Sequence, residues 1–326
     1  MLLNGTALVT GAGSGIGRAV ALACAAGGCR AITVADKNLE GVQQTERLVK
    51  EIGNKVKILT LSIDVSEVKA VENTVLRTVE AFGSLDYGQR AVSVFVKFFK
   101  RISLFVYWLI NRILQPLTLQ VFVYLSSSAE VTSSFKGKIS CKARVATAKY
   151  PMEEYDDIQA VNARGLALCT RAEIQAMLKQ NPKVTIDSYS SLRAQRGSIV
   201  NIASTCGSNV IPDLFPYVAS KHTVMGITKA AGVDHATDLV RINAVCPGLV
   251  ETPMIAARRK QLQDRNQETP TTSSEAWAPA NMYNTPLGRL ALAEEVADTC
   301  VFLASSMSSH ITASSITVDG GRTAAY

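Results

Sequence analysis

The hydrophobic positions of the chain follow two alternating patterns, short continuous apolar runs and longer segments in which apolar residues recur at helical spacing. The short runs predict buried strands, and the longer segments predict helices. The predicted strands cover residues 7–9, 31–35, 56–61, 85–87, 198–203, 240–245 and 315–318. The predicted helices cover residues 15–27, 39–52, 67–82, 152–179, 216–231 and 293–304. Strands that alternate with helices of this length indicate βαβ units, and therefore an α/β fold with a parallel sheet covered by helices on both faces.

Two stretches interrupt this alternation. Residues 253–288 are rich in Pro, Thr, Ser and Gln, and we expect them to form a mobile lobe between a strand and a helix. Residues 89–136 combine six Lys or Arg with one acidic residue, and they hold nine of the 20 aromatic residues. This segment carries +5 of the net charge of +7, so the rest of the chain is nearly neutral. A basic charge confined to one segment argues against a nucleic-acid-binding protein.

Composition excludes further classes of protein. The 326 residues are 47% hydrophobic and 19% charged, which is enough apolar surface for a substantial core. The seven cysteines include no CxxC pair and the three histidines no HxxxH pair, so we expect neither a disulfide framework nor a metal site. The chain runs from Met1 almost directly into a strand-like segment, and we therefore expect a cytoplasmic protein without a signal peptide.

A glycine-rich turn lies directly between the first predicted strand and the first predicted helix. Glycines there let the backbone approach a pyrophosphate, and the helix N-terminus supplies free N–H groups. Asp36 follows 19 residues after the last glycine, where a carboxylate can accept both ribose hydroxyls and repel a 2′-phosphate. Arg18 and Lys37 are cations that would favour NADP, but on balance the sequence favours NAD. The predicted cofactor-binding residues of the turn are Gly11, Ser14, Gly15, Ile16 and Gly17.

Asp64 and Val65 end the third predicted strand, and the Asp64 carboxylate could bind the adenine amino group. Asp64 or Ser66 could equally cap the following helix, and the two roles are compatible.

Three residues form a candidate catalytic group. Tyr217 and Lys221 are four residues apart and therefore share one face of a helix, and Ser204 follows a predicted strand at its carboxyl end, where ligands bind in α/β sheets. An adjacent ammonium favours the phenolate form of tyrosine, which can then exchange a proton with a hydroxyl group. Cys206 has no histidine at a suitable spacing to activate it as a nucleophile.

These residues together resemble the short-chain dehydrogenase/reductase family. Residues 10–17 match its TGxxxGxG motif, and Ser204, Tyr217 and Lys221 match its catalytic triad. The resemblance implies that Asn162 completes a tetrad by holding a water on the proton relay. It also implies that the backbone of Val250 and the hydroxyl of Thr252 bind the nicotinamide carboxamide, with Tyr217 and Lys221 also contacting the cofactor.

The resemblance covers residues 5–88 and 137–326, and it implies a single Rossmann-like domain over 1–326. The sheet would be doubly wound and parallel, with about seven strands, and the protein a homo-oligomer.

The chain departs from the family after the fourth predicted strand, where the family has N-N-A-G. Here Gln89 and Arg90 follow Gly88, and Gly137 could supply the last glycine of the motif. We interpret residues 89–136 as an insertion that replaced the motif, from translated intron sequence or a gene-model error. Two alternatives remain, a basic-aromatic segment that contacts a membrane surface and a lid over the cofactor. Neither apolar run in the segment reaches the roughly 20 residues of a membrane-spanning helix.

The sequence therefore predicts an NAD-dependent oxidoreductase that transfers a hydride between the cofactor and a small secondary alcohol or ketone. Tyr217 would be the acid/base, and residues 253–288 the mobile substrate lobe. The alternative is a catalytically impaired dinucleotide-binding protein, membrane-associated through residues 89–136.

Overall fold

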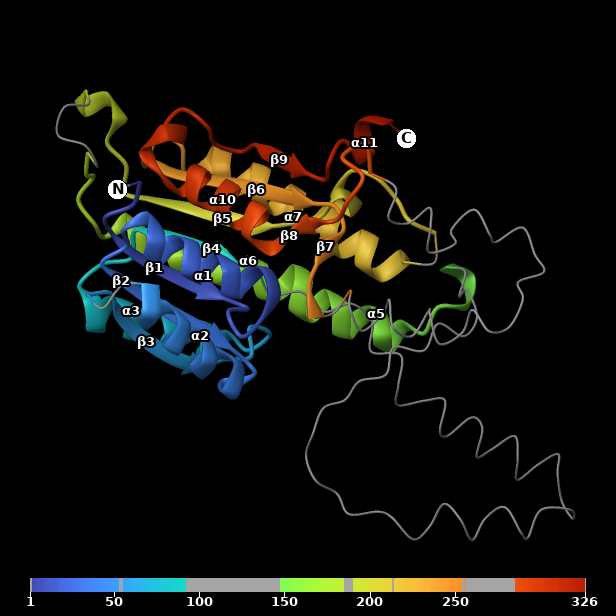
Figure 1. Cartoon of the computed structure of the whole chain (residues 1–326), viewed down its shortest axis with the longest axis horizontal. Helices are drawn as coiled ribbons and strands as arrows, with labels where there is room; N and C mark the ends of the chain where they lie inside the picture. Colours follow the sequence, from blue (N-terminus) through green and yellow to red (C-terminus); the bar gives the residue numbers. More distant parts are fainter. Residues whose placement is uncertain are drawn as a thin grey trace, which may run out of the picture.

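The computed structural model describes residues 2–52, 55–91, 147–184, 190–212, 214–253, 255 and 285–325. Seven parallel strands form its sheet, in the order β3-β2-β1-β4-β5-β6-β9 (Figure 1). Their bounds are β1 Thr6–Thr10, β2 Ala31–Asp36, β3 Lys57–Ser62, β4 Tyr87–Arg90, β5 Gly197–Ile202, β6 Val240–Pro247 and β9 Ser315–Val318. The order reverses between β1 and β4, so ligands are expected at the carboxyl ends of these strands.

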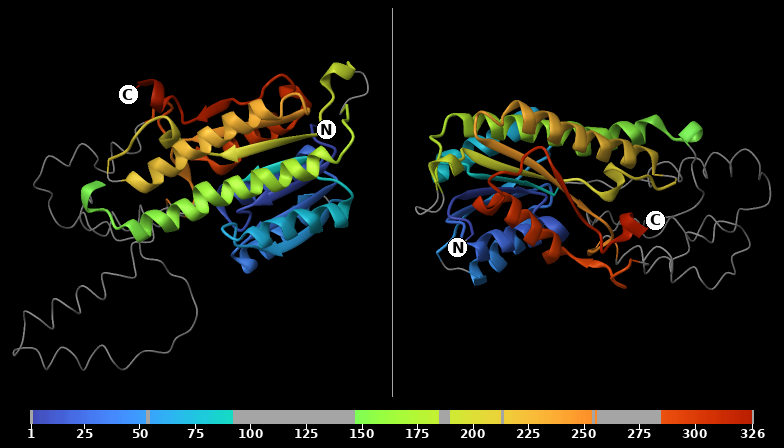
Figure 2. Two further views of the ribbon diagram at one scale, coloured as in Figure 1. Left: turned by 180° about the vertical axis from the view of Figure 1, so that it is seen from behind. Right: turned by 90° about the horizontal axis from the view of Figure 1, so that it is seen from above.

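Helices connect the strands. Their bounds are α1 Gly15–Gly27, α2 Leu39–Ile52, α3 Val68–Phe82, α5 Met152–Gln159, α6 Leu166–Leu178, α7 Phe215–Asp234, α10 Ala293–Ala304 and α11 Arg322–Ala325. Short single turns cover Thr147–Lys149, Ser191–Arg193, Thr205–Gly207 and Ser306–Ser308. Helices α1, α2 and α10 pack together on one face of the sheet, and α3, α6 and α7 on the other, where α6 and α7 run side by side (Figure 2).

The core lies on both faces of the central strands, because these strands are buried from end to end. Along β1, Ala7 and Val9 belong to the apolar layer under α1 and α10, and Leu8 belongs to the layer under α6. Strands buried on both faces need apolar residues at every position rather than at alternate ones. This requirement explains why the sequence shows continuous apolar runs, and it confirms the predicted doubly wound parallel sheet.

Three features differ from the sequence prediction. The single helix expected over residues 152–179 is divided into α5, a π-helical segment at Ala160–Gly165, and α6. The fourth strand begins at Tyr87 and ends at Arg90, so Gln89 and Arg90 of the predicted insertion belong to β4. A second sheet of two short parallel strands, β7 Val250–Glu251 and β8 Ala291–Leu292, was not predicted.

Within the described part of the chain, none of the helices has the length and apolar character needed to span a membrane. The six described cysteines are all buried, and none is in a disulfide.

Candidate active site

The glycine-rich turn holds its shape because two of its residues adopt backbone angles that suit glycine. Gly11 and Gly15 have φ angles of 74° and 52°, in the left-handed region. A Cβ atom on Gly17 would lie 2.0 Å from the carbonyl oxygen of Gly11, so only glycine lets the first turn of α1 approach β1 this closely. The predicted phosphate-binding residues thus lie together at the N-terminus of a helix. This arrangement fits a dinucleotide, because the turn leaves the backbone bare where a pyrophosphate would bind.

Asp36 at the end of β2 lies beside this turn. Its Oδ2 accepts a hydrogen bond of 3.0 Å from the backbone N–H of Gly13, and its Oδ1 accepts one of 2.9 Å from that of Asn38. Each carboxylate oxygen has a further lone pair, so the side chain can still accept hydrogen bonds from a ribose. The position and the chemistry both fit the ribose-binding role predicted for Asp36.

The two cations near this carboxylate are already engaged. The Arg18 guanidinium donates to the carbonyl oxygens of Gly13, at 2.5 Å, and Gly41, at 3.3 Å. Its Nε donates to Thr45 Oγ1 at 3.0 Å. The Lys37 ammonium lies 2.7 Å from Asp64 Oδ2. Both cations thus already have partners in the chain, and each keeps further N–H donors.

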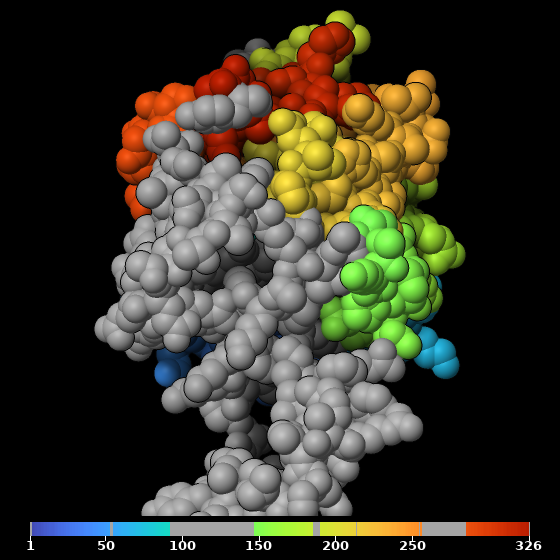
Figure 3. All heavy atoms as spheres, turned by 90° about the vertical axis from the view of Figure 1, so that its right-hand side faces the viewer, coloured from blue at the N-terminus to red at the C-terminus, as the bar shows by residue number. Residues whose placement is uncertain are grey.

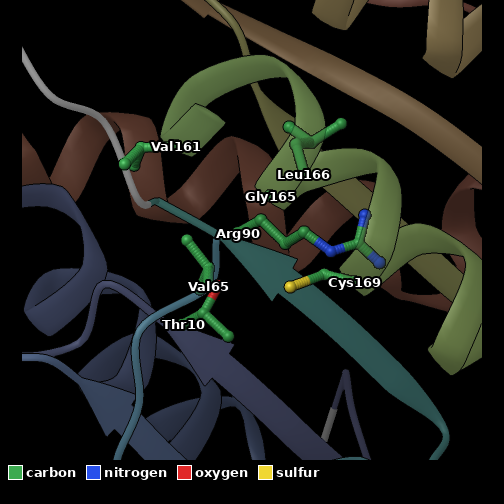
Figure 4. A pocket seen from close by; sticks show the side chains of 7 residues that line it. All are labelled: Thr10, Val65, Arg90, Val161, Gly165, Leu166 and Cys169. Atoms are coloured by element: carbon green, nitrogen blue, oxygen red, sulfur yellow. The ribbon is translucent and has the colours of Figure 1, made fainter. Parts of the chain in front are cut away.

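Asp64 lies two residues after the end of β3 rather than at its last position. Hydrogen bonds from Lys37 and from both the hydroxyl and the backbone N–H of Ser66 hold the pKa of Asp64 at about 2. The carboxylate closes the turn before α3 through Ser66, and it also pairs with Lys37. The N-cap of α3 is Glu67, without a side-chain capping hydrogen bond, so the expectation that Asp64 or Ser66 caps this helix was wrong. The side chain of Val65 is buried and lines a small cavity with Thr10 and Arg90 (Figure 4).

Tyr217 and Lys221 lie on the same face of α7, as the sequence predicted. The Lys221 Nζ is 5.5 Å from the centre of the Tyr217 ring and donates a hydrogen bond of 3.1 Å to the carbonyl oxygen of Ile202, the last residue of β5. Lys221 is only 1% exposed, and burial lowers its pKa to about 8. The structure thus places a buried amine against the aromatic ring at the carboxyl end of the sheet.

Ser204 follows β5 by two residues and is also buried. Its Oγ accepts a hydrogen bond of 3.1 Å from the backbone N–H of Cys206, which leaves the hydroxyl proton available for another acceptor. Burial raises the pKa of the Cys206 thiol, so this residue does not have the character of a nucleophile. The loop after β5 lies between the first turns of α5 and the C-terminal segment on the surface seen in Figure 3.

Asn162 lies in the π-helical segment and reaches α7. Its Nδ2 donates a hydrogen bond of 3.1 Å to the Oγ of Ser220, whose hydroxyl donates to the carbonyl oxygen of Tyr217 at 2.7 Å. Asn162 is 1% exposed. The extra residue per turn in a π-helix changes the direction of the side chains after it, and such segments are frequent at functional sites.

Val250 and Thr252 lie after β6, where the sequence predicted a nicotinamide contact. Val250 belongs to the short strand β7, and Thr252 lies against the glycine-rich turn: a Cβ atom on Gly15 would be 3.4 Å from the Thr252 methyl carbon. The structure therefore brings the turn after β1 and the segment after β6 together.

Several predicted features fall elsewhere. Gly137, residues 92–136 and nearly all of residues 253–288 lie outside the described residues. His222 is exposed, and its Nδ1 lies 3.0 Å from the carbonyl oxygen of Val218. Among the described residues, no three His, Cys, Asp or Glu side chains are grouped as a metal site would require.

A buried ion pair beside this site was missed by the sequence analysis. Arg90 at the end of β4 pairs with Glu173 on α6. The sequence did contain a signal for it, because Glu173 stands between Cys169 and Met177 at intervals of four residues, and a carboxylate on such an apolar helix face needs a buried partner.

Comparison with known proteins decides the family. A family model described as short chain dehydrogenase matches residues 5–90, and one described as Enoyl-(Acyl carrier protein) reductase matches residues 137–323. The short-chain dehydrogenase anuF of Penicillium roqueforti is 32% identical over 98% of this chain and 96% of its own length. The chain belongs to the short-chain dehydrogenase family. Residues 91–136 of this dehydrogenase are matched by neither family model.

Further relatives and solved structures agree with this assignment. The short-chain dehydrogenase srdC of Neurospora crassa is 32% identical over all of this chain and 99% of its own. The crystal structure of levodione reductase is 26% identical, covers both chains completely and has a TM-score of 0.74. That of actinorhodin polyketide ketoreductase with NADPH is 28% identical over 98% of this chain and 97% of its own, with a TM-score of 0.70. This short-chain dehydrogenase is therefore an oxidoreductase with the Rossmann-like fold.

Proposed function

We propose that this dehydrogenase interconverts a secondary alcohol and a ketone with NAD as the cofactor. The observation that carries the proposal is the placement of Lys221 against Tyr217 at the carboxyl end of β5, which Ser204 follows by two residues. When bound, the nicotinamide supplies or accepts the hydride. The remaining chemistry is the transfer of one proton to or from the substrate oxygen, and side chains of the protein carry out this transfer.

Tyr217 is the proposed acid/base. Free tyrosine has a pKa of about 10 and is a poor base at neutral pH. A neighbouring ammonium favours the phenolate, and Lys221 in its protonated form supplies that charge from within a buried site, where electrostatic interactions are strong. In alcohol oxidation the Tyr217 oxygen takes the hydroxyl proton, and in ketone reduction it returns the proton to the substrate oxygen.

Ser204 and Asn162 support this proton transfer. Ser204 Oγ accepts the Cys206 N–H, so its own hydroxyl proton is available, and we propose that it is donated to the substrate oxygen. Asn162 is bonded through Ser220 to the backbone of Tyr217 and is proposed to hold the water that connects Lys221 with solvent. Both residues orient the reacting groups, which contributes to the rate by fixing the geometry before reaction.

The preference for NAD rests on Asp36 and Arg18. A 2′-phosphate would meet the Asp36 carboxylate, whereas the nearest guanidinium is bonded to two backbone carbonyls and a threonine. Ribose hydroxyls can instead donate to the same carboxylate. Gly11, Ser14, Gly15, Ile16 and Gly17 would hold the pyrophosphate, with Asp64 and Val65 at the adenine and Val250 and Thr252 at the nicotinamide.

The proposed substrate is a small apolar ketone or alcohol. Levodione reductase and polyketide ketoreductase, both named among the similar structures, act by their names on ketones. The neutral character of the chain outside residues 89–136 suits an uncharged substrate. We also propose a cytoplasmic homo-oligomer, as is common in the family.

The test is turnover of a panel of cyclic ketones and secondary alcohols, followed by the absorbance of the reduced nicotinamide. Tyr217→Phe should abolish turnover while NADH still binds. Tyr155→Phe is the matched control, because it removes a phenol oxygen from a ring that stacks on Phe215, with ring centres 5.4 Å apart. Retained turnover in Tyr217→Phe would refute the proposed acid/base.

A second candidate, a dinucleotide-binding protein with impaired catalysis, is favoured by one observation. Arg90 ends β4 where the family has the first residues of N-N-A-G, and the segment that follows is matched by no family model. Under this candidate the wild-type chain binds NADH and shows no turnover with any member of the panel.

A further inference from the structure

An ion pair is buried at the centre of the fold, apart from the residues of the proposed proton transfer. Arg90 on β4 and Glu173 on α6 are 3% and 0% exposed at their side chains, and the guanidinium Nη2 lies 2.5 Å from Glu173 Oε2. Figure 4 shows the Arg90 side chain extending from β4 toward the helix that carries Cys169. Each charge depends on the other, because an isolated ion is strongly unfavourable in such surroundings.

The same guanidinium also holds the neighbouring strand. Arg90 Nη1 donates to Asn201 Oδ1 on β5 at 2.5 Å and to Thr170 Oγ1 on α6 at 2.7 Å. The bond to Oδ1 determines how the Asn201 amide is oriented, since its Nδ2 must then point away from the cation. Arg90 thereby joins α6, β4 and β5 through one group.

The oriented amide reaches the helix that carries the proposed catalytic pair. Asn201 Nδ2 donates to Thr228 Oγ1 on α7 at 2.9 Å, and the Thr228 hydroxyl donates to the carbonyl oxygen of Val224 at 2.8 Å. The bonds from Arg90 through Asn201 and Thr228 to Val224 run in one consistent direction, whereas Arg90 Nε and Glu173 Oε1 have no hydrogen-bond partner among the described residues. A reversed Asn201 amide would oppose an N–H₂ group to the guanidinium and lose the bond to Arg90.

This link lies next to the contact that holds Lys221. Ile202, whose carbonyl oxygen accepts the Lys221 ammonium, directly follows Asn201, and Thr228 lies two helical turns after Lys221. Helix α7 is thus bonded to β5 at two successive strand residues. Among the described residues no carboxylate forms a salt bridge with Lys221, so its place depends on the position of the β5 backbone.

We propose that Arg90, held by Glu173, is a positioning residue for Lys221: it sets the alignment of α7 on β5 that buries the Lys221 ammonium against the carbonyl oxygen of Ile202. The inference rests on the proposed roles of Tyr217 and Lys221. Arg90 itself touches neither of them, and it acts through Asn201 and Thr228.

The experiment must separate positioning from stability alone. Arg90→Met leaves the Glu173 carboxylate without its cation and is expected to lower the melting temperature strongly. The double variant Arg90→Met with Glu173→Leu leaves no buried charge, so it should recover most of the melting temperature. Arg241→Met is the matched control, because Arg241 is another buried arginine. It lies near the start of β6, at the amino ends of the strands, and is bonded to Gln195, Ser308 and backbone carbonyls.

The decisive readout is the titration of Lys221 itself in the full chain without cofactor. Lysine labelled with ¹³C at Cε gives an NMR signal for each residue, and the Lys221 signal is the one absent from Lys221→Met. The titratable groups that face this amine are Tyr217 on α7, Cys206 after β5 and Cys246 on β6, and all remain in every variant. In the wild type we expect the Lys221 signal to titrate near pH 8.

In the double variant we expect the Lys221 midpoint to rise by about one unit, because a displaced ammonium regains solvent. We also expect the midpoint of the lower limb of the pH profile of turnover to rise by about one pH unit. At a fixed pH on that limb, this shift is a tenfold loss of turnover. Arg241→Met should lower the melting temperature and move neither midpoint. A double variant with the wild-type Lys221 midpoint and pH profile would overturn the proposal. A failure of the proposed acid/base role gives a different result from a failure of this proposal. In that case the Tyr217→Phe variant would keep normal turnover, whatever the titration midpoint of Lys221 in the other variants.

Discussion

Lys221 donates its hydrogen bond to the carbonyl oxygen of Ile202 at 3.1 Å while its side chain is almost completely buried. A carbonyl oxygen is a neutral acceptor, so it replaces only part of the hydration that the ammonium loses. Burial accordingly lowers the Lys221 pKa from 10.5 to about 8. The position of this amine therefore costs stability, a cost that its proposed role beside Tyr217 would explain.

The first prediction concerns stability against pH. The pKa of Lys221 is lower in the folded chain than in the unfolded one, so the unfolded state binds more protons between pH 8 and 10.5 and stability rises across this window. Relative to Lys221→Met, the wild type should gain about 3 kcal/mol of unfolding free energy from pH 8 to 10.5. Urea unfolding of both proteins at several pH values measures this, and taking the difference removes the contribution of the shared thiols. Parallel curves for the two proteins would contradict it.

The second prediction concerns cofactor choice. Asp36→Ser removes the carboxylate that we propose binds the ribose, while a serine can still accept one of the two backbone N–H bonds. Hydrogen bonds to charged groups contribute about 1.5–3 kcal/mol, so kcat/KM with NAD should fall by at least tenfold. The value with NADP should fall less or rise, because the repulsion is gone. The ratio of the two kcat/KM values is the measurement, since it does not depend on how much protein is folded. An unchanged ratio would mean that Asp36 does not select the cofactor.

The sequence predicted the outer parts of the fold well, for identifiable reasons. Helices α1, α2 and α10 have the predicted bounds. The end of the preceding strand marks where each helix begins, and a glycine or serine directly after the last helical residue marks where it ends. Ser204 also follows the end of β5, and Tyr217 and Lys221 share one face of α7, as expected. Their arrangement follows from two short-range rules, the four-residue spacing on a helix and the carboxyl-end position on a parallel sheet.

What could not be predicted depends on contacts between distant segments. The two-residue strands β7 and β8 pair across 41 residues of chain and have no periodicity of their own. The π-helical segment at Ala160–Gly165 follows a helical pattern that a sequence cannot distinguish from an ordinary helix. Arg90 was assigned to an insertion because it stands where the family has N-N-A-G, whereas its burial depends on Glu173, 83 residues away.

The third prediction compares two glycines. Gly17→Ala would place a Cβ atom 2.0 Å from the backbone oxygen of Gly11, so the turn must open. We expect NADH binding to weaken at least tenfold. Gly226→Ala is the control: it lies on the exposed side of α7 with no atom within 4 Å of the new Cβ, and it should raise stability by about 1 kcal/mol through helix propensity. NADH titration and thermal unfolding measure both variants. Equal NADH affinity for Gly17→Ala and the wild type would show that the turn does not bind the cofactor.

The last prediction concerns the segment that neither family model matches. Strand β4 is paired on both sides, with β1 and with β5, and the backbone N–H of Ala91 still donates to the carbonyl of Thr10 at 3.0 Å. The sheet is thus complete up to the point where the extra residues begin. Since the cost of closing a loop grows only slowly with its length, the full chain should fold. Its turnover should nevertheless be weak, because Thr10 and the glycine-rich turn adjoin the end of β4.

Two shortened chains test this. One lacks residues 91–136 and has Asn-Ala inserted between Arg90 and Gly137; the other lacks only residues 92–136. Both keep Arg90 with its partner Glu173. We expect kcat/KM of the first to exceed that of the full chain by at least tenfold, because the cofactor-binding edge of β4 regains the last three residues of the family motif. The second separates the effect of length from that of the motif: recovery in both chains assigns the defect to the extra residues alone. Equal NADH binding and turnover in all three proteins would establish that residues 91–136 are compatible with a fully functional enzyme.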